Sequence, residues 1–235
     1  MQQEQQVLDY GFVKILNVSG PERRPDQLYD ASDRDPANSA RMSFAQKDSG
    51  RTEDQDAKLC EYLMAHLHTT PFEMIEVWIE MKMPIFVARQ FVRHRTVSIN
   101  EVSGRYVQLP AEWYIPKVVG GKAPNAKQGQ EDNLSEFEQE EFRAALNRHC
   151  GNGYLLYNEA IDRGVAPEHA RMLLSLNHYT HWLWKQDLHN LMHFLALRMD
   201  SHAQVEAQAY ANSIYNQLCA VLPKTMVLFD RYRRK

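Results

Sequence analysis

The sequence predicts an α+β fold in which a small antiparallel sheet packs with a predominantly helical remainder. Apolar and polar residues alternate over residues 73–83, as in a half-buried strand. Four segments in the second half instead have helical periodicity and recognisable start or stop signals. No internal repeat is visible, and 235 residues are enough for one large core. We therefore predict a single domain over residues 1–235.

The N-terminal part is predicted to contain one strand and two helices. A first strand is expected over 10–18, and a polar, proline-punctuated stretch over 19–40 leads into a short helix. Residues 46–56 are charged and contain a glycine, which indicates a loop excursion. Leucines at every fourth position then predict a helix over 56–68.

A proline separates the alternating strand from the next helix. Pro84 ends the strand and suits the first turn of a helix over 85–94. That helix would place Arg89 and Arg93 one turn apart on one face. A further strand is predicted over 105–109.

The second half is predicted to be mostly helical. Residues 117–132 are rich in Gly, Lys, Gln and Asn and are expected to form a second loop excursion. Ser135 and Glu138 form a capping box for a long helix that ends near 163–164. Further helices are predicted over 167–174, 187–199 and 201–222.

The overall charge and the cysteines exclude several function classes. The formal net charge of −3 gives no field that would attract DNA, RNA or an anionic membrane. The three cysteines are far apart and lack metal or redox spacing, so we expect reduced thiols and a cytoplasmic protein. The N-terminus has no apolar signal core, and no apolar run has the length of a membrane span.

The most informative segment is residues 93–106, Arg-His-Arg-Thr-Val-Ser-Ile-Asn-Glu-Val-Ser-Gly-Arg-Tyr. It holds three arginines, a histidine, a carboxylate and two serines. Guanidinium groups alternating with hydroxyls suit a phosphate and a polar ring. The alternative is a cluster of surface ion pairs at a helix end, which is common for single arginines.

Two other segments carry groups that could perform chemistry. His68, Thr70 and Glu73 lie where a predicted helix meets the alternating strand, although a helix-ending histidine followed by a turn would look the same. His189 and His193 are four residues apart, a spacing that zinc sites use. A metal-dependent hydrolase is therefore an alternative. No glutamate lies inside the pair and no third ligand stands at an obvious spacing, so we predict no metal site.

At this point the sequence resembles a known family, the flavin-dependent thymidylate synthases. The resemblance begins with Arg93-His94-Arg95, followed after seven residues by Ser103, which matches the family signature. It continues in order over nearly the whole chain, from about residue 10 to 210. The other similar segments are 41–44, 61–64, 68–73, 84–90, 170–171, 177–180 and 195–204.

The resemblance implies reductive methylation of dUMP to dTMP. 5,10-Methylenetetrahydrofolate would donate the one-carbon unit, FAD would carry the hydride and NADPH would reduce the flavin. It also implies an α+β fold and a homotetramer with active sites between subunits. The family uses no enzyme thiolate, in agreement with cysteines that lie in hydrophobic or featureless contexts.

The resemblance also implies which residues form the site. The dUMP residues would be Gln90, Arg93, Glu101, Ser103, Gly104, Arg105, Arg171 and Arg198, with Arg171 from a neighbouring chain. The FAD residues would be Thr70, Arg93, His94, Arg95, Glu101, Asp187, His189 and His193. Ser43 and His68 would be further pocket residues. Arg198 is expected to be catalytic, because an arginine can stabilise negative charge on the uracil ring without losing its proton.

The chain departs from many members of the family at the expected flavin site. Many have Asn and Arg where this chain has Asp187 and His189, and some have Asn where it has His193. Because a carboxylate would repel the flavin pyrophosphate, we expect Asp187 to cap the helix that begins there. A nucleotide-binding or regulatory protein without turnover is another alternative, and the presence of Arg198 with the full arginine motif argues against it.

Overall fold

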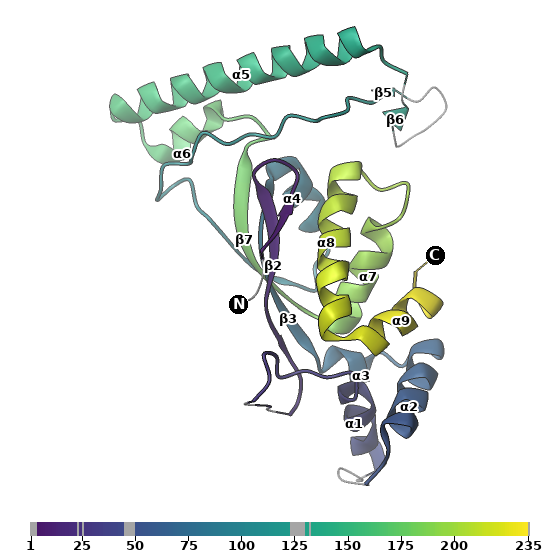
Figure 1. The fold of residues 1–235 in the computed structure, drawn as a ribbon. Coiled ribbons are helices and arrows are strands. Elements are labelled where there is room, and N and C mark those ends of the chain that lie inside the picture. Colours follow the sequence, from purple (N-terminus) through teal and green to yellow (C-terminus); the bar gives the residue numbers. More distant parts are fainter. Residues whose placement is uncertain are drawn as a thin grey trace.

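The computed structural model describes residues 4–22, 24, 26–44, 50–122, 130–131 and 133–234. Its main sheet has five strands in the order β1-β2-β3-β7-β4, and every neighbouring pair is antiparallel. The strands are β1 (Gln5–Val7), β2 (Gly11–Ser19), β3 (Glu76–Pro84), β4 (Ser98–Glu101) and β7 (Tyr179–Asp187). Helices α7 (Leu188–Arg198) and α8 (Val205–Val221) lie beside this sheet (Figure 1). The predicted α+β class is confirmed.

One face of the sheet forms the core. On β3, Val77, Ile79 and Met81 are fully buried, as the alternation predicts. Complete burial of side chains of this size contributes about 1.5–3 kcal/mol each. The opposite face is polar, and cross-strand pairs such as Glu76 with Lys185, at 3.0 Å, lie on it.

The second central strand, β7, was not predicted. It pairs with β3 along nine residues, from Glu76 opposite Asp187 to Pro84 opposite Tyr179. Its buried residues alternate, with Trp182 and Trp184 facing the core. The histidines of this segment indicated a ligand site and not a strand. The β3–β7 pairing also joins residues too distant in sequence for a local pattern to reveal.

The strand predicted over 105–109 is wrong. The ladder of this region lies earlier, at β4, which pairs with the outer edge of β7. A turn follows it, because the amides of Tyr106 and Val107 both donate to the Ser103 carbonyl, at 3.0 and 3.2 Å. The Arg105 amide also donates to the Ser103 hydroxyl, at 3.3 Å. These bonds replace the ladder bonds of a strand.

Several predicted boundaries shift for local reasons. Helix α2 (Glu53–Ala65) begins before residue 56 because Thr52 and Gln55 form a capping box. A short helix, α3 (Thr70–Glu73), occupies the start of the predicted alternating strand. Helix α4 (Ile85–Phe91) ends before Arg93, which therefore does not share a helical face with Arg89. Of the two predicted loop excursions, residues 46–49, 123–129 and 132 lie outside the described residues.

The N-terminal and C-terminal helices pack against each other. Helix α1 (Asp35–Arg41) and the 3₁₀ turn η1 (Met42–Phe44) precede α2. Helix α8 begins four residues later than predicted, and α9 (Pro223–Tyr232) was not predicted at all. Pro223 ends α8 and also occupies the first turn of α9, a position where its missing amide costs nothing. Helix α9 packs against α2 and α8 (Figure 1).

A long helix stands apart from this body. Helix α5 (Glu136–Asp162) has the predicted Ser135–Glu138 capping box and is followed by Gly164 at φ +80°. It packs against α6 (Pro167–Ala170) and the 3₁₀ turn η2 (Arg171–Leu173) and lies at the top of Figure 1, beyond the end of the sheet. The short strands β5 (Gly121–Lys122) and β6 (Gln130–Glu131) precede it. We call α5, α6 and η2 the arm. Among the described helices, none has the length and apolar character needed to cross a membrane.

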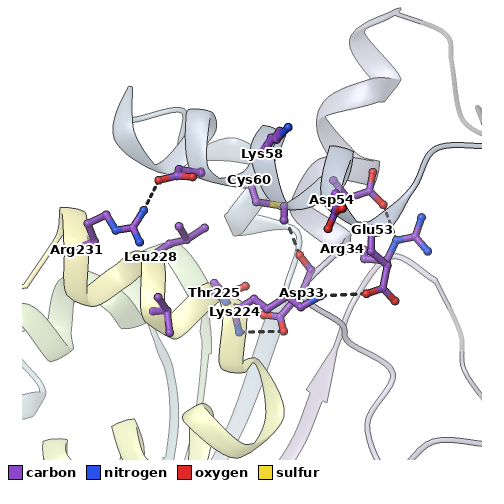
Figure 2. A pocket seen from close by; sticks show the side chains of 14 residues that line it. Asp33, Arg34, Glu53, Asp54, Lys58, Cys60, Lys224, Thr225, Leu228 and Arg231 are labelled. Atoms are coloured by element: carbon purple, nitrogen blue, oxygen red, sulfur yellow. Dashed lines mark hydrogen bonds and ion pairs between the residues drawn. The ribbon is translucent and has the colours of Figure 1, made fainter.

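Asp33 holds the start of α9 in place. Its carboxylate accepts hydrogen bonds from the amides of Lys224 and Thr225, at 3.1 and 2.7 Å. Its carbonyl accepts from the Cys60 thiol of α2, at 3.4 Å (Figure 2). Asp33 therefore acts as the N-terminal cap of α9 from a distant part of the chain, since α9 has no capping side chain of its own.

We expect Asp33→Ala to lower the free energy of unfolding by about 1–2 kcal/mol, because two amides lose an anionic acceptor. Urea denaturation measures this loss. The matched control is Glu53→Ala, which removes the exposed Glu53–Lys224 ion pair and should destabilise the protein less than Asp33→Ala, because an exposed ion pair contributes little. Equal effects of the two substitutions would contradict the capping role.

Candidate active site

Arg198 is held at two points in the last turn of α7. Its Nε donates a hydrogen bond to Nε2 of His94 at 3.1 Å, and its Nη2 donates to the Gln90 carbonyl at 3.1 Å. The side chain is half-buried. The structure thus brings three predicted site residues together from α4, the turn after α4 and α7.

The hydrogen bond from Arg198 determines the state of His94. A guanidinium can only donate, so His94 Nε2 must accept, and the ring is neutral with its proton on Nδ1. Burial, followed by the charges of Arg198 and His193, lowers the pKa of His94 to about 4. Phe194 packs edge-to-face against the ring with centroids 4.9 Å apart. His94 is therefore a fixed acceptor at neutral pH.

Two exposed arginines follow α4 in the same region. Within the described part of the chain, neither Arg93 nor Arg95 forms an ion pair. Gln90 lies on α4, before Arg93 in sequence. Its side chain donates a hydrogen bond to the side chain of Gln204, at the start of α8. Arg93 and Arg95 flank His94, which contacts Arg198, so their positive charge makes this region suitable for an anionic ligand.

A second group of predicted residues gathers around the turn after β4. Gly104 is buried under Arg171, since a Cβ at Gly104 would lie 3.4 Å from the Arg171 Cδ. Arg105 forms an ion pair with Glu168 of α6 at 3.2 Å, and Ser103 starts the turn. Among the described residues, no hydrogen bond or ion pair joins this group to Arg198.

Glu101 lies between these groups at the end of β4. Its Oε1 accepts a hydrogen bond from the Thr180 hydroxyl at 2.5 Å. Thr180 is buried on β7, so the carboxylate of Glu101 is anchored to the sheet while the residue itself stays exposed.

The remaining predicted residues lie around α3 and the start of α7. Thr70 opens α3, which packs against α7. The Asp187 Oδ1 accepts from the Asn190 amide at 2.9 Å, and its Oδ2 accepts from the Asn190 side chain at 2.8 Å. The predicted cap is confirmed. His189 and His193 stand one turn apart on α7.

The charge near His189 comes from several elements. Burial and the charges of Arg233 and His193 lower the pKa of His189, and Glu73 and Asp187 oppose that shift. His189 is therefore neutral at pH 7. In the part of the chain that the structure describes, no group of three His, Cys, Asp or Glu side chains is placed to hold a metal ion. The pair of histidines thus has no third ligand there.

The other predicted pocket residues and the cysteines contribute less. Ser43 and His68 are both exposed, and the His68 ring lies 5.8 Å from that of Tyr62. Burial raises the pKa of Cys60 to about 12, so this thiol does not ionise at neutral pH.

The hydrogen bond that fixes the segment after Arg95 to the sheet was not predicted from the sequence. Gln186, buried on β7, donates from its side chain to the Thr96 hydroxyl at 3.1 Å, directly after Arg95. Thr96 lies within residues 93–106, so its position in that segment could have marked it as a site residue. Gln186 could not be identified in this way, because it belongs to the strand that local patterns did not show.

Two cavities lie elsewhere in the molecule. One, of about 400 Å³, lies between α2 and α9 and is lined by Cys60, Thr225 and Leu228 among others (Figure 2). The other, of about 670 Å³, is lined by Arg24, Arg41 and polar neighbours. None of the residues predicted to bind dUMP or FAD lines either cavity. Cavity size therefore does not identify the site in one protomer.

The His94–Arg198 contact gives a pH dependence that can be measured. Because the pKa of His94 is near 4 in the folded chain and about 6.5 when unfolded, the unfolded state binds more protons between these values. The free energy of unfolding should therefore fall as pH drops from about 6.5 to about 4. We expect His94→Gln, which keeps an acceptor but cannot titrate, to lose less stability over this range.

Urea denaturation at about pH 7.5 and about pH 5 measures this difference. His149→Gln is the matched control, since His149 is exposed on α5, and it should follow the wild type. An identical pH dependence in wild type and His94→Gln would contradict the neutral state assigned to His94.

The chain is similar to known proteins over most of its length. Residues 27–224 match the family model described as thymidylate synthase complementing protein. The chain is 41% identical, over 97% of its length and 73% of the relative's, to the flavin-dependent thymidylate synthase of Ehrlichia ruminantium (strain Gardel). It is 42% identical to a flavin-dependent thymidylate synthase of Thermus thermophilus, covering 96% of this chain and 78% of the relative.

A solved structure is similar over almost its whole length. The UMP/dUMP methylase PolB from Streptomyces cacaoi, bound with 5-Br dUMP, superposes with a TM-score of 0.83 at 26% identity. The alignment covers 98% of both chains.

Proposed function

Since this chain belongs to the family of flavin-dependent thymidylate synthases, we infer that it converts dUMP to dTMP by reductive methylation. 5,10-Methylenetetrahydrofolate supplies the one-carbon unit, and NADPH is the reductant. FAD, when bound, supplies the hydride chemistry. The observation that carries this proposal is the guanidinium of Arg198, held by His94 and Gln90, together with Arg93 and Arg95, which form no ion pair with any residue that the structure describes.

Arg198 activates the pyrimidine in this proposal. Its Nε and Nη2 are engaged by His94 and Gln90, and no described residue accepts a hydrogen bond from its Nη1. Nη1 can therefore donate to a uracil oxygen and stabilise negative charge on the ring, which makes the ring carbon nucleophilic. Because both contacts exist before substrate arrives, the donor needs little reorganisation during the reaction.

The turn group holds the rest of the nucleotide. Amides around Ser103 and the guanidinium groups of Arg105 and Arg171 suit the phosphate of dUMP. Glu101, anchored by Thr180, lies two residues before Ser103 in sequence and supplies a carboxylate to this group. The structural relative bound to 5-Br dUMP supports a pyrimidine nucleotide as the ligand class.

The flavin fits the region of α3 and α7. Thr70 and His193 are exposed there, His189 is neutral and Asp187 is occupied as a helix cap. The first-turn amides of α7 form a positive helix end that suits an anionic group. The remaining FAD residues of the proposal are Arg93, His94, Arg95 and Glu101, which follow α4.

We also propose a homotetramer with active sites between subunits. In one protomer, Arg171 lies against Gly104, and no hydrogen bond or ion pair among the described residues joins this group to Arg198, which supports a site completed by a second chain. The arm exposes apolar side chains, including Phe137 at 74% and Met172 at 75%, as expected of a subunit interface. A single domain in the cytoplasm completes the proposal, and its free cysteines support a reducing compartment.

Arg198→Ala tests the catalytic role directly. We expect the purified variant to keep its yellow flavin colour and to lose dTMP formation by about 10²–10³-fold, because a preorganised donor to the developing charge is removed. Flavin absorbance and an assay with dUMP, methylenetetrahydrofolate, FAD and NADPH measure the two properties.

Arg198→Lys is the control, since it keeps a positive charge but cannot contact both His94 and Gln90. It should stay well below wild-type turnover. Wild-type turnover in Arg198→Ala, or wild-type protein that stays colourless after incubation with FAD, would contradict the proposal.

The shared site predicts recovery of activity by mixing. Arg198→Ala and Arg171→Ala should each be inactive alone, because each removes one side of the site. After unfolding and refolding together, about a quarter of the sites should combine two intact sides. The dTMP assay should then show activity that neither variant has. Mixtures no more active than the separate variants would show that both arginines act from one chain.

A further inference from the structure

Arg231, Arg233 and Arg234 lie in the last turn of helix α9 or just after it, and Arg233 differs from the other two. Arg231 forms an ion pair with Glu61, and Arg234 forms one with Asp230 at 3.3 Å. Arg233, the residue after α9, forms no ion pair with any residue that the structure describes, and its Nη2 is buried without a hydrogen bond. A basic tail in the sequence gives no sign of this difference.

An unpartnered buried guanidinium nitrogen is energetically unfavourable. Leaving a buried charged donor without an acceptor costs more than leaving a buried neutral donor without one. Burial also lowers the pKa of Arg233, although the group stays charged at neutral pH. An anionic acceptor from outside the described chain would remove this cost.

The surroundings of Arg233 indicate where that acceptor lies. The charge of Arg233 acts on His189, in the first turn of α7. His189 is neutral, and the carboxylate of Asp187 is committed to Asn190 through both oxygens. Arg233 and the amide end of α7 therefore supply positive charge to this corner of the molecule, opposite the carboxylates of Glu73 and Asp187.

We propose that Arg233 is a cofactor-binding residue whose guanidinium contacts the pyrophosphate of FAD beside the first turn of α7. The inference rests on the flavin position proposed above, between α3 and α7. A planar guanidinium fork matches two phosphate oxygens at once, which an ammonium group cannot do. Arg233 thus adds a cation to a flavin site whose other proposed residues lie between Thr70 and His193.

Flavin titration of the apoprotein tests this assignment without measuring turnover. FAD and riboflavin, which lacks phosphate, are each titrated by flavin fluorescence into wild type, Arg233→Gln and the matched control Arg234→Gln. We expect Arg233→Gln to bind FAD about tenfold more weakly and riboflavin as wild type does. Added salt should weaken FAD binding less in Arg233→Gln than in wild type. Arg234→Gln should match wild type throughout.

Two further measurements keep the outcomes separate. Thermal unfolding of the apoproteins should give a midpoint for Arg233→Gln that equals or exceeds that of wild type, because the variant removes an unpartnered buried charge. A lowered midpoint with weaker riboflavin binding would show a structural role instead. Unchanged FAD affinity in Arg233→Gln, with weakened affinity in His193→Ala, would overturn the assignment of Arg233 alone. Unchanged affinity in both variants would overturn the flavin position itself.

Discussion

The pairing of β3 with β7 is the constraint on which the rest of the structure depends. These strands are about a hundred residues apart in sequence and pair over their full length. β3 leads directly into α4, and β7 leads into α7 from the opposite end of the ladder. Helix α7 then runs back along the sheet for about 16 Å, which brings Arg198 to His94 and Gln90. A shift in this register would separate the two sides of the arginine contact.

The parts that sequence reasoning predicted are those whose causes are local. The alternation in β3, the Ser135 capping box and the Asp187 cap each depend on residues within a few positions of one another. The position of β7 and the Gln186–Thr96 anchor depend on pairing between distant segments. The turn at Ser103 was hidden for another reason, since residues 105–109 have the composition of a strand and backbone bonds to one carbonyl override it. The motif residues were found because their chemistry is unusual, while their grouping required the fold.

The side chains of the candidate site are held in one protonation state or in one hydrogen-bonded position. His94 accepts from Arg198 because burial keeps it neutral, and Glu101 is bound by a buried hydroxyl. Such contacts replace the water that an exposed arginine would otherwise bind, and they leave part of the guanidinium free for a ligand. Electrostatic catalysis depends on this kind of preorganisation, because dipoles that are already oriented need not move when charge develops. Among the described residues, no hydrogen bond or ion pair joins the Ser103–Arg171 group to Arg198, so the contacts within one chain do not link these two groups.

Helix α7 has one further consequence. Its amide end faces the proposed flavin region and its carbonyl end carries Arg198, so both ends of its dipole match the charges placed there. The eleven residues of α7 therefore fix both the distance and the rotational angle between its first turn and Arg198. Inserting one residue would turn Arg198 by about 100° and move it about 1.5 Å along the axis, away from His94 and Gln90. Substitutions along α7 can vary without altering this spacing, whereas a change in its length cannot, so evolution of this segment is expected to proceed by replacement and not by insertion or deletion.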